Sequence, residues 1–122
     1  MNYLLLGGAG FIGTHLAKRL LEEGNQVTII DSLATSTSPD YGVNFIKGDI
    51  STMDLDIQLM EADLVYYLAG SVGVEYIDKN PSSTLFNNID LMTKLIPAFE
   101  RAQTKVIFSS TSEVYGEGPT FK

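Results

Sequence analysis

The sequence predicts an α/β fold, in which a doubly wound parallel sheet of about five strands has helices on both faces. Short apolar runs alternate with longer stretches of helical periodicity along the 122 residues, which is typical of βαβ units. The apolar runs contain almost no polar residues, as expected of strands that have helices over both faces. We expect strands at about 2–6, 27–30, 43–46, 63–68 and 105–109.

The first strand runs directly into a glycine-rich turn, Gly7-Gly8-Ala9-Gly10-Phe11-Ile12-Gly13, and then into an amphipathic helix. A glycine at the first position permits a sharp turn, the second lets the backbone approach phosphates, and the third allows close packing of helix on strand. The helix N-terminus offers free N–H groups and a positive dipole end to an anion. The pattern predicts a dinucleotide site in a Rossmann-like sheet, with Gly7, Gly10, Phe11, Ile12 and Gly13 as its first residues.

Asp31 ends the next apolar run and lies 18 residues after Gly13. This spacing is close to the ~20 residues expected for the acidic residue that binds the adenosine ribose. A carboxylate there accepts hydrogen bonds from both ribose hydroxyls and repels a 2′-phosphate. Residues 32–38 contain no Arg or Lys that could bind such a phosphate. The sequence therefore predicts NAD rather than NADP, with Ser32 beside Asp31; the alternative is that Asp31 only begins a solvated loop.

The composition is that of one ordinary globular domain. A hydrophobic fraction of 44% and a charged fraction of 19% are typical of a folded chain rather than a disordered one. With zero cysteines there are no disulfides and no thiolate metal ligands, and a cytoplasmic location is expected. No apolar stretch has the length of a membrane span, and no signal segment precedes the first strand. The net charge of −7 disfavours nucleic acid and anionic membranes as partners.

Two helices are expected in the first half of the chain. The first, at about 11–23, would end at Gly24, a residue type suited to the position just after a helix. A short helix near 54–60 has Ser51 or Thr52 as its candidate cap. The only histidine, His15, lies on the first helix, where we expect a surface or packing role; no ligand spacing suggests a metal.

A long helix at about 82–102 has two apolar stripes, which indicates that it is covered on two sides. The first stripe is Leu85, Ile89, Met92, Ile96 and Phe99, and the second is Leu91, Leu95, Ala98 and Ala102. The sheet and a neighbouring helix could cover them, or one stripe could be a subunit contact. For the second interpretation we predict the contact around Leu91, Leu95 and Ala98. Pro97 inside this helix predicts a kink.

Hydroxyl and acidic residues follow the last expected strand, in Ser109-Ser110-Thr111-Ser112-Glu113. Because ligands bind at the carboxyl ends of strands in an open parallel sheet, this cluster is predicted to face the same cleft as the glycine turn. A hydroxyl such as Thr111 can hydrogen-bond a substrate oxygen, and Glu113 can act as acid or base. Ser and Thr are also ordinary turn residues after a strand, so the residues alone leave both interpretations open.

Six motifs occur along the chain: Gly7–Gly13, Asp31, Gly48-Asp49-Ile50, Leu68-Ala69-Gly70, Asn87-Asn88-Ile89 and Ser110–Gly116. Together, and in this order, they resemble the extended short-chain dehydrogenase/reductase family. Its members are NAD-dependent nucleotide-sugar epimerases, dehydratases and decarboxylases. The resemblance covers essentially the whole chain.

The resemblance implies a cofactor role for several further residues. Asp49 and Ile50 would contact the adenine, and Leu68, Ala69 and Gly70 would line the ribose and nicotinamide side. Asn88 would support the cofactor site. Ser109 and Ser110 are assigned to the same site.

The resemblance also implies the chemistry. Thr111 would be the catalytic hydroxyl beside the sugar of a UDP-linked substrate. The sugar would be oxidised at C4 to give a 4-keto intermediate. The form Ser-Thr-Ser-Glu-Val-Tyr-Gly is most similar to the UDP-glucuronate decarboxylase and dehydratase branches, where Glu113 would take part in catalysis. In that branch Val72, Gly73, Val74, Glu75 and Tyr76 would lie near the sugar nucleotide. Members of the family form dimers, so a homodimer is expected of the parent enzyme.

One departure from the family pattern concerns its Tyr-x-x-x-Lys pair. None of the tyrosines, at 3, 41, 66, 67, 76 and 115, has a lysine four residues later. We therefore expect residues 1–122 to be the N-terminal, NAD-binding portion of a longer enzyme, without its C-terminal substrate domain and inactive as given. A non-catalytic dinucleotide-binding or sensing protein is the main alternative, and a flavoprotein is a more distant one.

Overall fold

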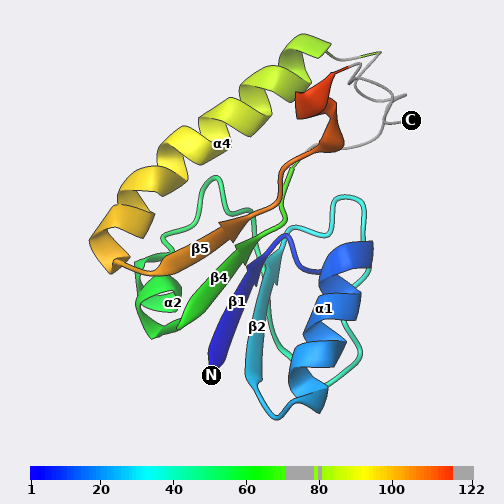
Figure 1. Cartoon of the computed structure of the whole chain (residues 1–122), viewed down its shortest axis with the longest axis vertical. Helices are drawn as coiled ribbons and strands as arrows, with labels where there is room; N and C mark the ends of the chain where they lie inside the picture. Colours follow the sequence, from blue (N-terminus) through cyan, green and yellow to red (C-terminus); the bar gives the residue numbers. More distant parts are fainter. Residues whose placement is uncertain (71–78, 80, 117–122) are drawn as a thin grey trace, which may run out of the picture.

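The computed structural model describes residues 1–70, 79 and 81–116, which contain one five-stranded parallel sheet (Figure 1). The strands are β1 (Asn2–Leu6), β2 (Gln26–Asp31), β3 (Asn44–Lys47), β4 (Leu64–Tyr67) and β5 (Lys105–Phe108). Their order is β3-β2-β1-β4-β5. The chain therefore adds β2 and β3 on one side of β1, and then adds β4 and β5 on the other side. This topology confirms the predicted doubly wound sheet, and it places a switch point between β1 and β4.

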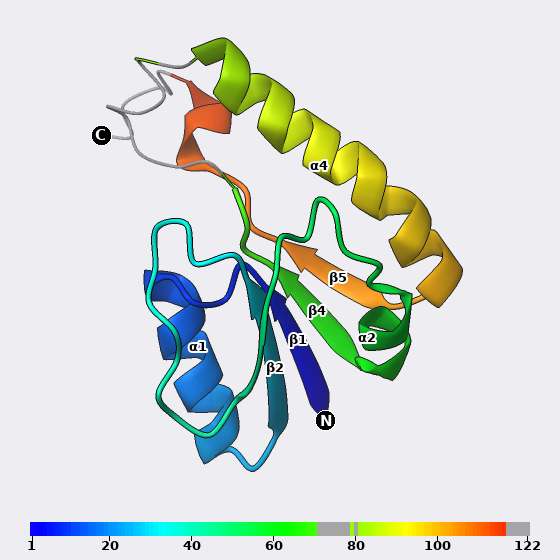
Figure 2. The same cartoon turned by 180° about the vertical axis from the view of Figure 1, so that it is seen from behind.

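Helices cover both faces of the sheet, as the sequence predicts. Helix α1 (Phe11–Glu22) lies along β1 and β2, whereas α2 (Asp56–Glu61) and α4 (Pro81–Ala102) lie along β4 and β5 (Figures 1 and 2). A short 3-10 helix, η1 (Ser112–Tyr115), follows β5 and was not predicted. No helix in the described part of the chain is long and apolar enough to cross a membrane.

The alternation of side chains along β1 divides the core into two clusters. Leu4 and Leu6 face α2 and α4, where they pack with Leu95, whereas Leu5 faces α1 and packs with Leu20. The three leucines of the strand are each at most 1% exposed. A continuous apolar run at residues 4–6 is therefore needed, because each successive side chain enters a different core.

Helix α1 ends where glycine was predicted to end it. Gly24 has φ +80°, in the left-handed region that glycine adopts without a Cβ penalty. The Gly24 N–H donates to the Leu21 carbonyl at 2.9 Å, and the Asn25 N–H donates to the Leu20 carbonyl at 3.1 Å. These two bonds form a Schellman motif, which satisfies carbonyls at the end of the helix.

The predicted cap of the short helix is wrong. Helix α2 begins at Asp56, whose N–H donates to the Asp54 carboxylate at 3.0 Å. Ser51 and Thr52 belong instead to the preceding turn, where their N–H groups donate to Asp49 at 2.8 and 3.1 Å. The Asp54 carboxylate, two residues before Asp56, thus replaces the predicted hydroxyl cap, because Ser51 and Thr52 lie too far upstream of the helix.

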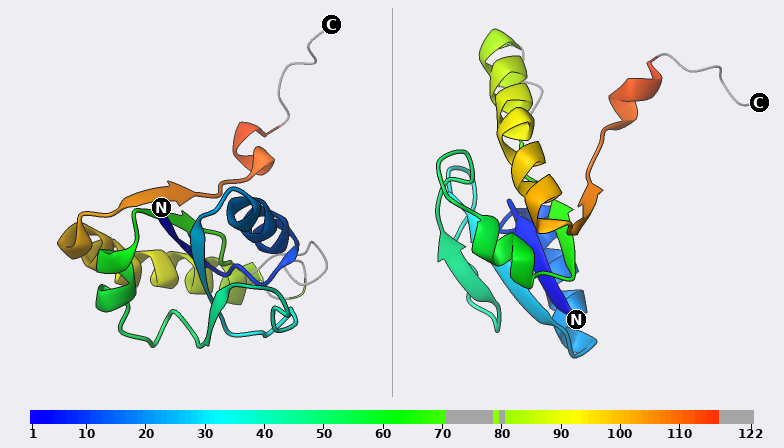
Figure 3. Two further views of the ribbon diagram at one scale, coloured as in Figure 1. Left: turned by 90° about the horizontal axis from the view of Figure 1, so that it is seen from below. Right: turned by 90° about the vertical axis from the view of Figure 1, so that its left-hand side faces the viewer.

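The predicted subunit contact on the long helix is also wrong. Leu95 and Ala98 are buried in the core against the sheet, and Leu91 packs beside them. The exposed apolar side chains of α4 are Leu85, Phe86, Ile89 and Ile96, mostly from the first stripe. The N-terminal half of α4 extends past the carboxyl ends of the strands (Figure 3), which leaves several of these side chains without cover from the sheet. One helix runs through Pro97, and the predicted kink stays a prediction.

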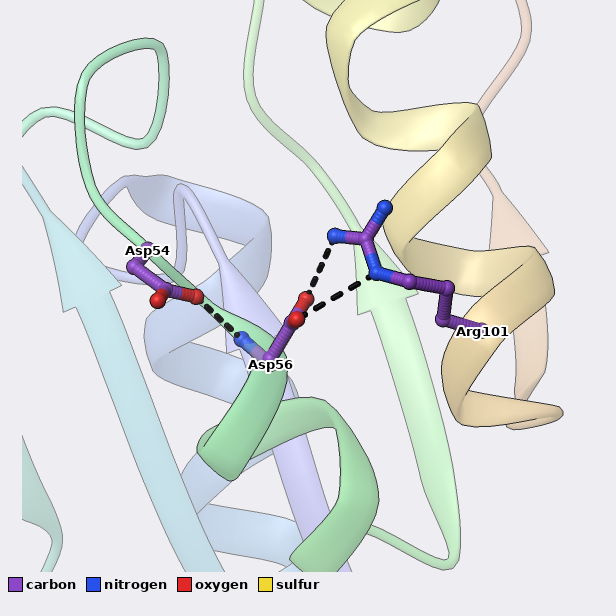
Figure 4. Close-up of polar contacts among 3 residues, drawn as sticks. All are labelled: Asp54, Asp56 and Arg101. Atoms are coloured by element: carbon purple, nitrogen blue, oxygen red, sulfur yellow. Dashed lines mark hydrogen bonds and ion pairs between the residues drawn. The ribbon is translucent and has the colours of Figure 1, made fainter.

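An ion pair joins the two helices that share a face of the sheet. The Arg101 guanidinium, in the last turn of α4, donates through Nη2 and Nε to the two carboxylate oxygens of Asp56 at 2.7 and 3.2 Å (Figure 4). This bonding lowers the pKa of Asp56 below its ordinary value. Both side chains are exposed, so the pair sets the position of α4 over α2 more than it stabilises the fold.

Candidate functional site

A cleft of about 570 Å³ opens at the carboxyl ends of the first four strands. Its lining includes ten of the residues assigned to the cofactor site from the sequence: Gly7, Gly10, Asp31, Ser32, Asp49, Ile50, Leu68, Ala69, Gly70 and Asn88. The structure therefore brings together residues that lie up to 81 positions apart in the chain. They meet because parallel strands present their carboxyl ends at one edge of the sheet.

Gly7 is required by both its conformation and its surroundings. Its φ is +77°, and a Cβ at this position would lie 2.6 Å from the Cα of Ala69. The Gly7 N–H donates to the carbonyl of Ile30 at 2.8 Å. The glycine turn is thus held against the ends of both β2 and β4, which flank β1.

Gly13 packs on the turn itself rather than on the strand that precedes it. A Cβ on Gly13 would collide with the carbonyl of Gly8. Gly8 in turn lies where a Cβ would be 2.7 Å from the Cβ of Leu5 and 3.1 Å from a methyl group of Ile29. Gly8 had no predicted role, although its place inside the glycine-rich motif was a signal for one.

Gly10 and the start of α1 provide the space and the donors for an anion. Gly10 is the N-cap, with φ −77°, and no side chain caps the helix in the described structure. A Cβ at Gly10 would meet nothing within 4 Å, so the backbone here faces open space. The first helical turn carries no acidic residue. Free N–H groups beside an empty cradle suit a phosphate.

Phe11 and Ile12 do not line the cleft with their side chains. Phe11 is 82% exposed and Ile12 is 66% exposed. The Phe11 ring packs against the tilted ring of His15 with ring centroids 4.6 Å apart, which agrees with the packing role expected for the histidine. Any contribution of these two residues to a bound anion would come from their backbone N–H groups.

Asp31 lines the cleft, and its carboxylate accepts three hydrogen bonds. Its Oδ2 accepts from the Ala9 N–H at 3.0 Å. Its Oδ1 accepts from the Leu33 N–H at 2.8 Å and from the Ser36 hydroxyl at 3.2 Å. These bonds hold the carboxylate between the glycine turn and the loop that follows β2.

The loop after β3 forms the opposite wall. Asp49 is exposed, and Ile50 beside it is 8% exposed. Hydrogen bonds from the Ser51 side chain and, to a smaller extent, from the Ser51 backbone lower the pKa of the Asp49 carboxyl. The positive charge of Lys94 acts in the same direction. An ionised carboxylate and a buried apolar side chain side by side can bind the amino edge and the face of a purine.

The charge of the cleft is negative. Among the described residues, the ionisable side chains of its lining are Asp31 and Asp49, with no Lys or Arg. The described residues contain no cluster of His, Cys, Asp or Glu that could hold a metal ion. A bound diphosphate would therefore be held by the helix terminus and backbone N–H groups rather than by cations.

The predicted catalytic segment lies at the same edge of the sheet but outside the cleft. Neither Ser109, Ser110 nor Thr111 is among the lining residues. The Ser109 hydroxyl instead donates to the Tyr67 carbonyl at 2.9 Å, extending the pairing of β5 with β4. Thr111 is exposed, and its carbonyl accepts the Val114 N–H at 3.3 Å at the start of η1. Val72, Gly73, Val74, Glu75 and Tyr76 lie outside the described residues, as does the side chain of Glu113.

Some lining residues were not assigned from the sequence. They are Ile30, Ala34, Thr35, Ser36, Gly48, Asn87 and Leu91. Gly48 and Asn87 each lie within one of the six motifs, so the motifs could have predicted their place in the cleft. Ser36 could be found only from the three-dimensional course of the loop, because a hydroxyl in a stretch rich in Ser and Thr carries no signal of its own.

The fold and the cleft together define a dinucleotide-binding domain: a glycine turn, an open helix terminus and an acidic residue ending β2 meet at the switch point of a parallel sheet. Comparison with known proteins gives the particular family. The model of the NAD dependent epimerase/dehydratase family matches residues 3–122, and the chain belongs to this family.

Named relatives are identical to the chain at about a third of the aligned positions. A UDP-N-acetyl-alpha-D-glucosaminuronate decarboxylase of Bacillus cytotoxicus is 34% identical over 94% of the chain and 38% of its own length. Among solved structures, a UDP-N-acetylglucosamine 4-epimerase of Methanobrevibacter ruminantium is 38% identical, with a TM-score of 0.85, over 98% of the chain and 40% of its own. The NAD-dependent NDP-hexosamine 5,6-dehydratase TunA is 33% identical, with a TM-score of 0.88, over the same shares. The chain thus spans about two fifths of the relatives it matches.

Proposed function

We propose that this chain is the NAD-binding portion of an enzyme that modifies a nucleotide-linked sugar. The observation that carries the proposal is the cleft in which the uncapped N-terminus of α1 and the carboxylate of Asp31 face the same space. The family supports the cofactor, and the three relatives named above support the substrate class.

The residues fit a dinucleotide in an extended arrangement. The diphosphate would lie at Gly10, where the space for a Cβ is open and the first N–H groups of α1 are free. The adenosine ribose would lie at Asp31 and the adenine between Asp49 and Ile50. The remaining wall, formed by residues 68–70 and Asn88, would face the nicotinamide side.

For the complete enzyme we propose epimerisation, dehydration or decarboxylation of a UDP-linked sugar. NAD, when bound, supplies a hydride acceptor for oxidation at the sugar C4. In this proposal Thr111 hydrogen-bonds the C4 oxygen and Glu113 assists proton movement, while residues 72–76 lie near the sugar nucleotide. The enzyme would be an isomerase or a lyase, located in the cytoplasm as the absence of cysteine favours.

A homodimer of the complete enzyme belongs to the same proposal. The exposed apolar face of α4, formed by Leu85, Phe86, Ile89 and Ile96, replaces the stripe predicted from the sequence as its contact. Side chains that are 45–64% exposed on one helix form a surface suited to a second copy. Sedimentation of a Leu85→Ser, Ile89→Ser variant should show weaker association than the unsubstituted chain, and equal association would contradict this contact.

Calorimetric titration with NAD tests the cofactor assignment. Gly10→Val should abolish binding, because its side chain would occupy the space of the diphosphate, while its Cβ would meet no protein atom within 4 Å. Gly42→Val is the matched control, since a Cβ there also meets nothing within 4 Å and Gly42 lies outside the cleft. Unchanged NAD binding by the Gly10 variant would overturn the assignment.

The preference between NAD and NADP tests the role of Asp31. Asp31→Ala should weaken NAD binding by more than about tenfold, because the loss of even one hydrogen bond to a charged group has an effect of that size. NADP binding should change less, because the substitution also removes the charge that repels the 2′-phosphate. Equal losses for both cofactors would show that Asp31 does not face the ribose.

A further inference from the structure

The hydrogen bond between Asp31 and Ala9 joins two parts of the cleft that the proposed function treats separately. Asp31 ends β2, whereas Ala9 lies inside the glycine turn, 22 residues earlier. The bond from the Ala9 N–H to Oδ2 is 3.0 Å long, and Ala9 is only 8% exposed. The bond therefore fixes the peptide between Gly8 and Ala9, one residue before Gly10, which is the N-cap of α1.

The loop after β2 holds the carboxylate in the orientation that this bond requires. The Leu33 N–H reaches Oδ1 at 2.8 Å, with Leu33 at φ +61°. A leucine rarely adopts this left-handed conformation, and such strain persists only where the surroundings over-determine it. The Ser36 hydroxyl adds a second donor to the same oxygen at 3.2 Å.

The count of acceptor sites shows how much of the carboxylate remains for a ligand. Each carboxylate oxygen accepts about two hydrogen bonds. Oδ1 already accepts two, from Leu33 and Ser36, and Oδ2 accepts one, from Ala9. One acceptor site is left, on the oxygen that holds the glycine turn. A ribose hydroxyl bound there would share Oδ2 with the Ala9 N–H.

We infer that Asp31 is a positioning residue for the phosphate-binding turn, in addition to any contact with the ribose. Through Oδ2 it holds Ala9, and thereby Gly10 and the first N–H groups of α1, in the geometry that an anion requires. The inference rests on the proposed function for the identity of the ligand, whereas the contact between Asp31 and the turn is independent of it.

Electrostatics and positioning predict opposite results when Asp31 is replaced. A negative charge in the cleft repels a diphosphate, so its removal alone should strengthen diphosphate binding. Loss of the contact with Ala9 should weaken binding, because the turn is no longer held in place. Asp40→Asn and Asp40→Ala are matched controls, since they remove the same charge from the loop after β2 while Asp40 is exposed and lies outside the lining of the cleft.

The experiment measures binding of inorganic pyrophosphate, which has no ribose hydroxyl, to the full chain by NMR of the backbone amides of residues 7–14. Relative to the unsubstituted chain, Asp31→Asn should bind pyrophosphate about threefold more weakly. Asp31→Ala, which keeps no acceptor, should bind it about tenfold more weakly, as expected for loss of a bond to a charged group. The two Asp40 variants should bind as tightly as the unsubstituted chain, or more tightly.

Amide hydrogen exchange provides a readout that needs no ligand. Exchange at Ala9 should accelerate about tenfold in Asp31→Ala while exchange at the core amides of Leu5 and Ile29 is unchanged. Uniform acceleration of turn and core amides would overturn the inference, because Asp31 would then stabilise the whole domain. Tighter pyrophosphate binding by the Asp31 variants, or no binding near Gly10 by the unsubstituted chain, would also overturn it. A chain that fails to bind NAD while Ala9 responds as expected would overturn the proposed function and support the inference.

Discussion

The centre of the sheet and its β5 edge differ in how completely the described residues cover them. At the ends of β1 and β2, Leu5, Leu6, Ile29 and Ile30 are fully buried, and the turn above them is held by bonds to its backbone. At the end of β5, Ile107 is 46% exposed and Phe108 is 50% exposed, like the outer face of α4. The phosphate side, at the ends of β1 and β2, is therefore fully packed, whereas the edge next to β5 presents apolar side chains to solvent.

The largest loss of stability is expected for a substitution at Gly7, on the phosphate side. Gly7→Ala should destabilise the domain by about 3 kcal/mol, because a Cβ there combines the left-handed φ with a backbone clash against Ala69. Gly24→Ala is the matched control: its φ is similar at +80°, but nothing lies within 4 Å, so a cost of about 1 kcal/mol is expected. Urea unfolding measures both. Equal costs would show that the contact with β4 relaxes easily.

Adjacent residues of α4 compare the two faces of one helix. Leu95→Ala should cost about 2–3 kcal/mol, because Leu95 is 3% exposed and its removal leaves a cavity in the core. Ile96→Ala should cost less than about 1 kcal/mol, since Ile96 is 45% exposed. Thermal or urea unfolding distinguishes the two. A larger loss for Ile96 would mean that the outer face of α4 is already covered in solution.

The pair of Asp56 and Arg101 should produce the smallest effect, and one that depends on pH. The pKa of Asp56 is lowered from 3.8, so its contribution to stability is present above that value and is lost as pH falls through the folded-state pKa. The stability difference between the unsubstituted chain and Asp56→Asn should therefore be small near neutrality and vanish in acid. A difference that persists unchanged at the lowest pH would have a cause other than this pair.

The phosphate side could be predicted because its determinants are local in sequence. The glycine turn, its helix and the acidic residue after β2 follow one another at spacings set by strand and helix geometry. Gly8 escaped assignment because its role is to fit between Leu5 and Ile29, a contact that depends on how α1 docks on the sheet. The bond from Ser36 to Asp31 depends in the same way on the course of a loop.

The face of α4 could not be predicted because both of its stripes are apolar. Hydropathy does not distinguish a leucine that meets the sheet from an isoleucine that does not, and only the docking angle of the helix decides. The cap of α2 was missed for a related reason. Ser51 and Thr52 have the right chemistry, but they belong to the preceding turn, where their N–H groups donate to Asp49. The roles of Thr111 and Glu113 came from the family resemblance, and they stay predictions.

The close approach of Gly7 to Ala69 has a consequence for the order in which the molecule is assembled. These residues lie 62 positions apart, so the packing of the turn against Ala69 cannot form before β4 has been synthesised. The bonds from Gly7 to Ile30 and from Ala9 to Asp31 need only the first 31 residues. On a ribosome, the turn would therefore be held by β2 first and be packed against β4 later, after a loop closure whose entropy opposes early formation.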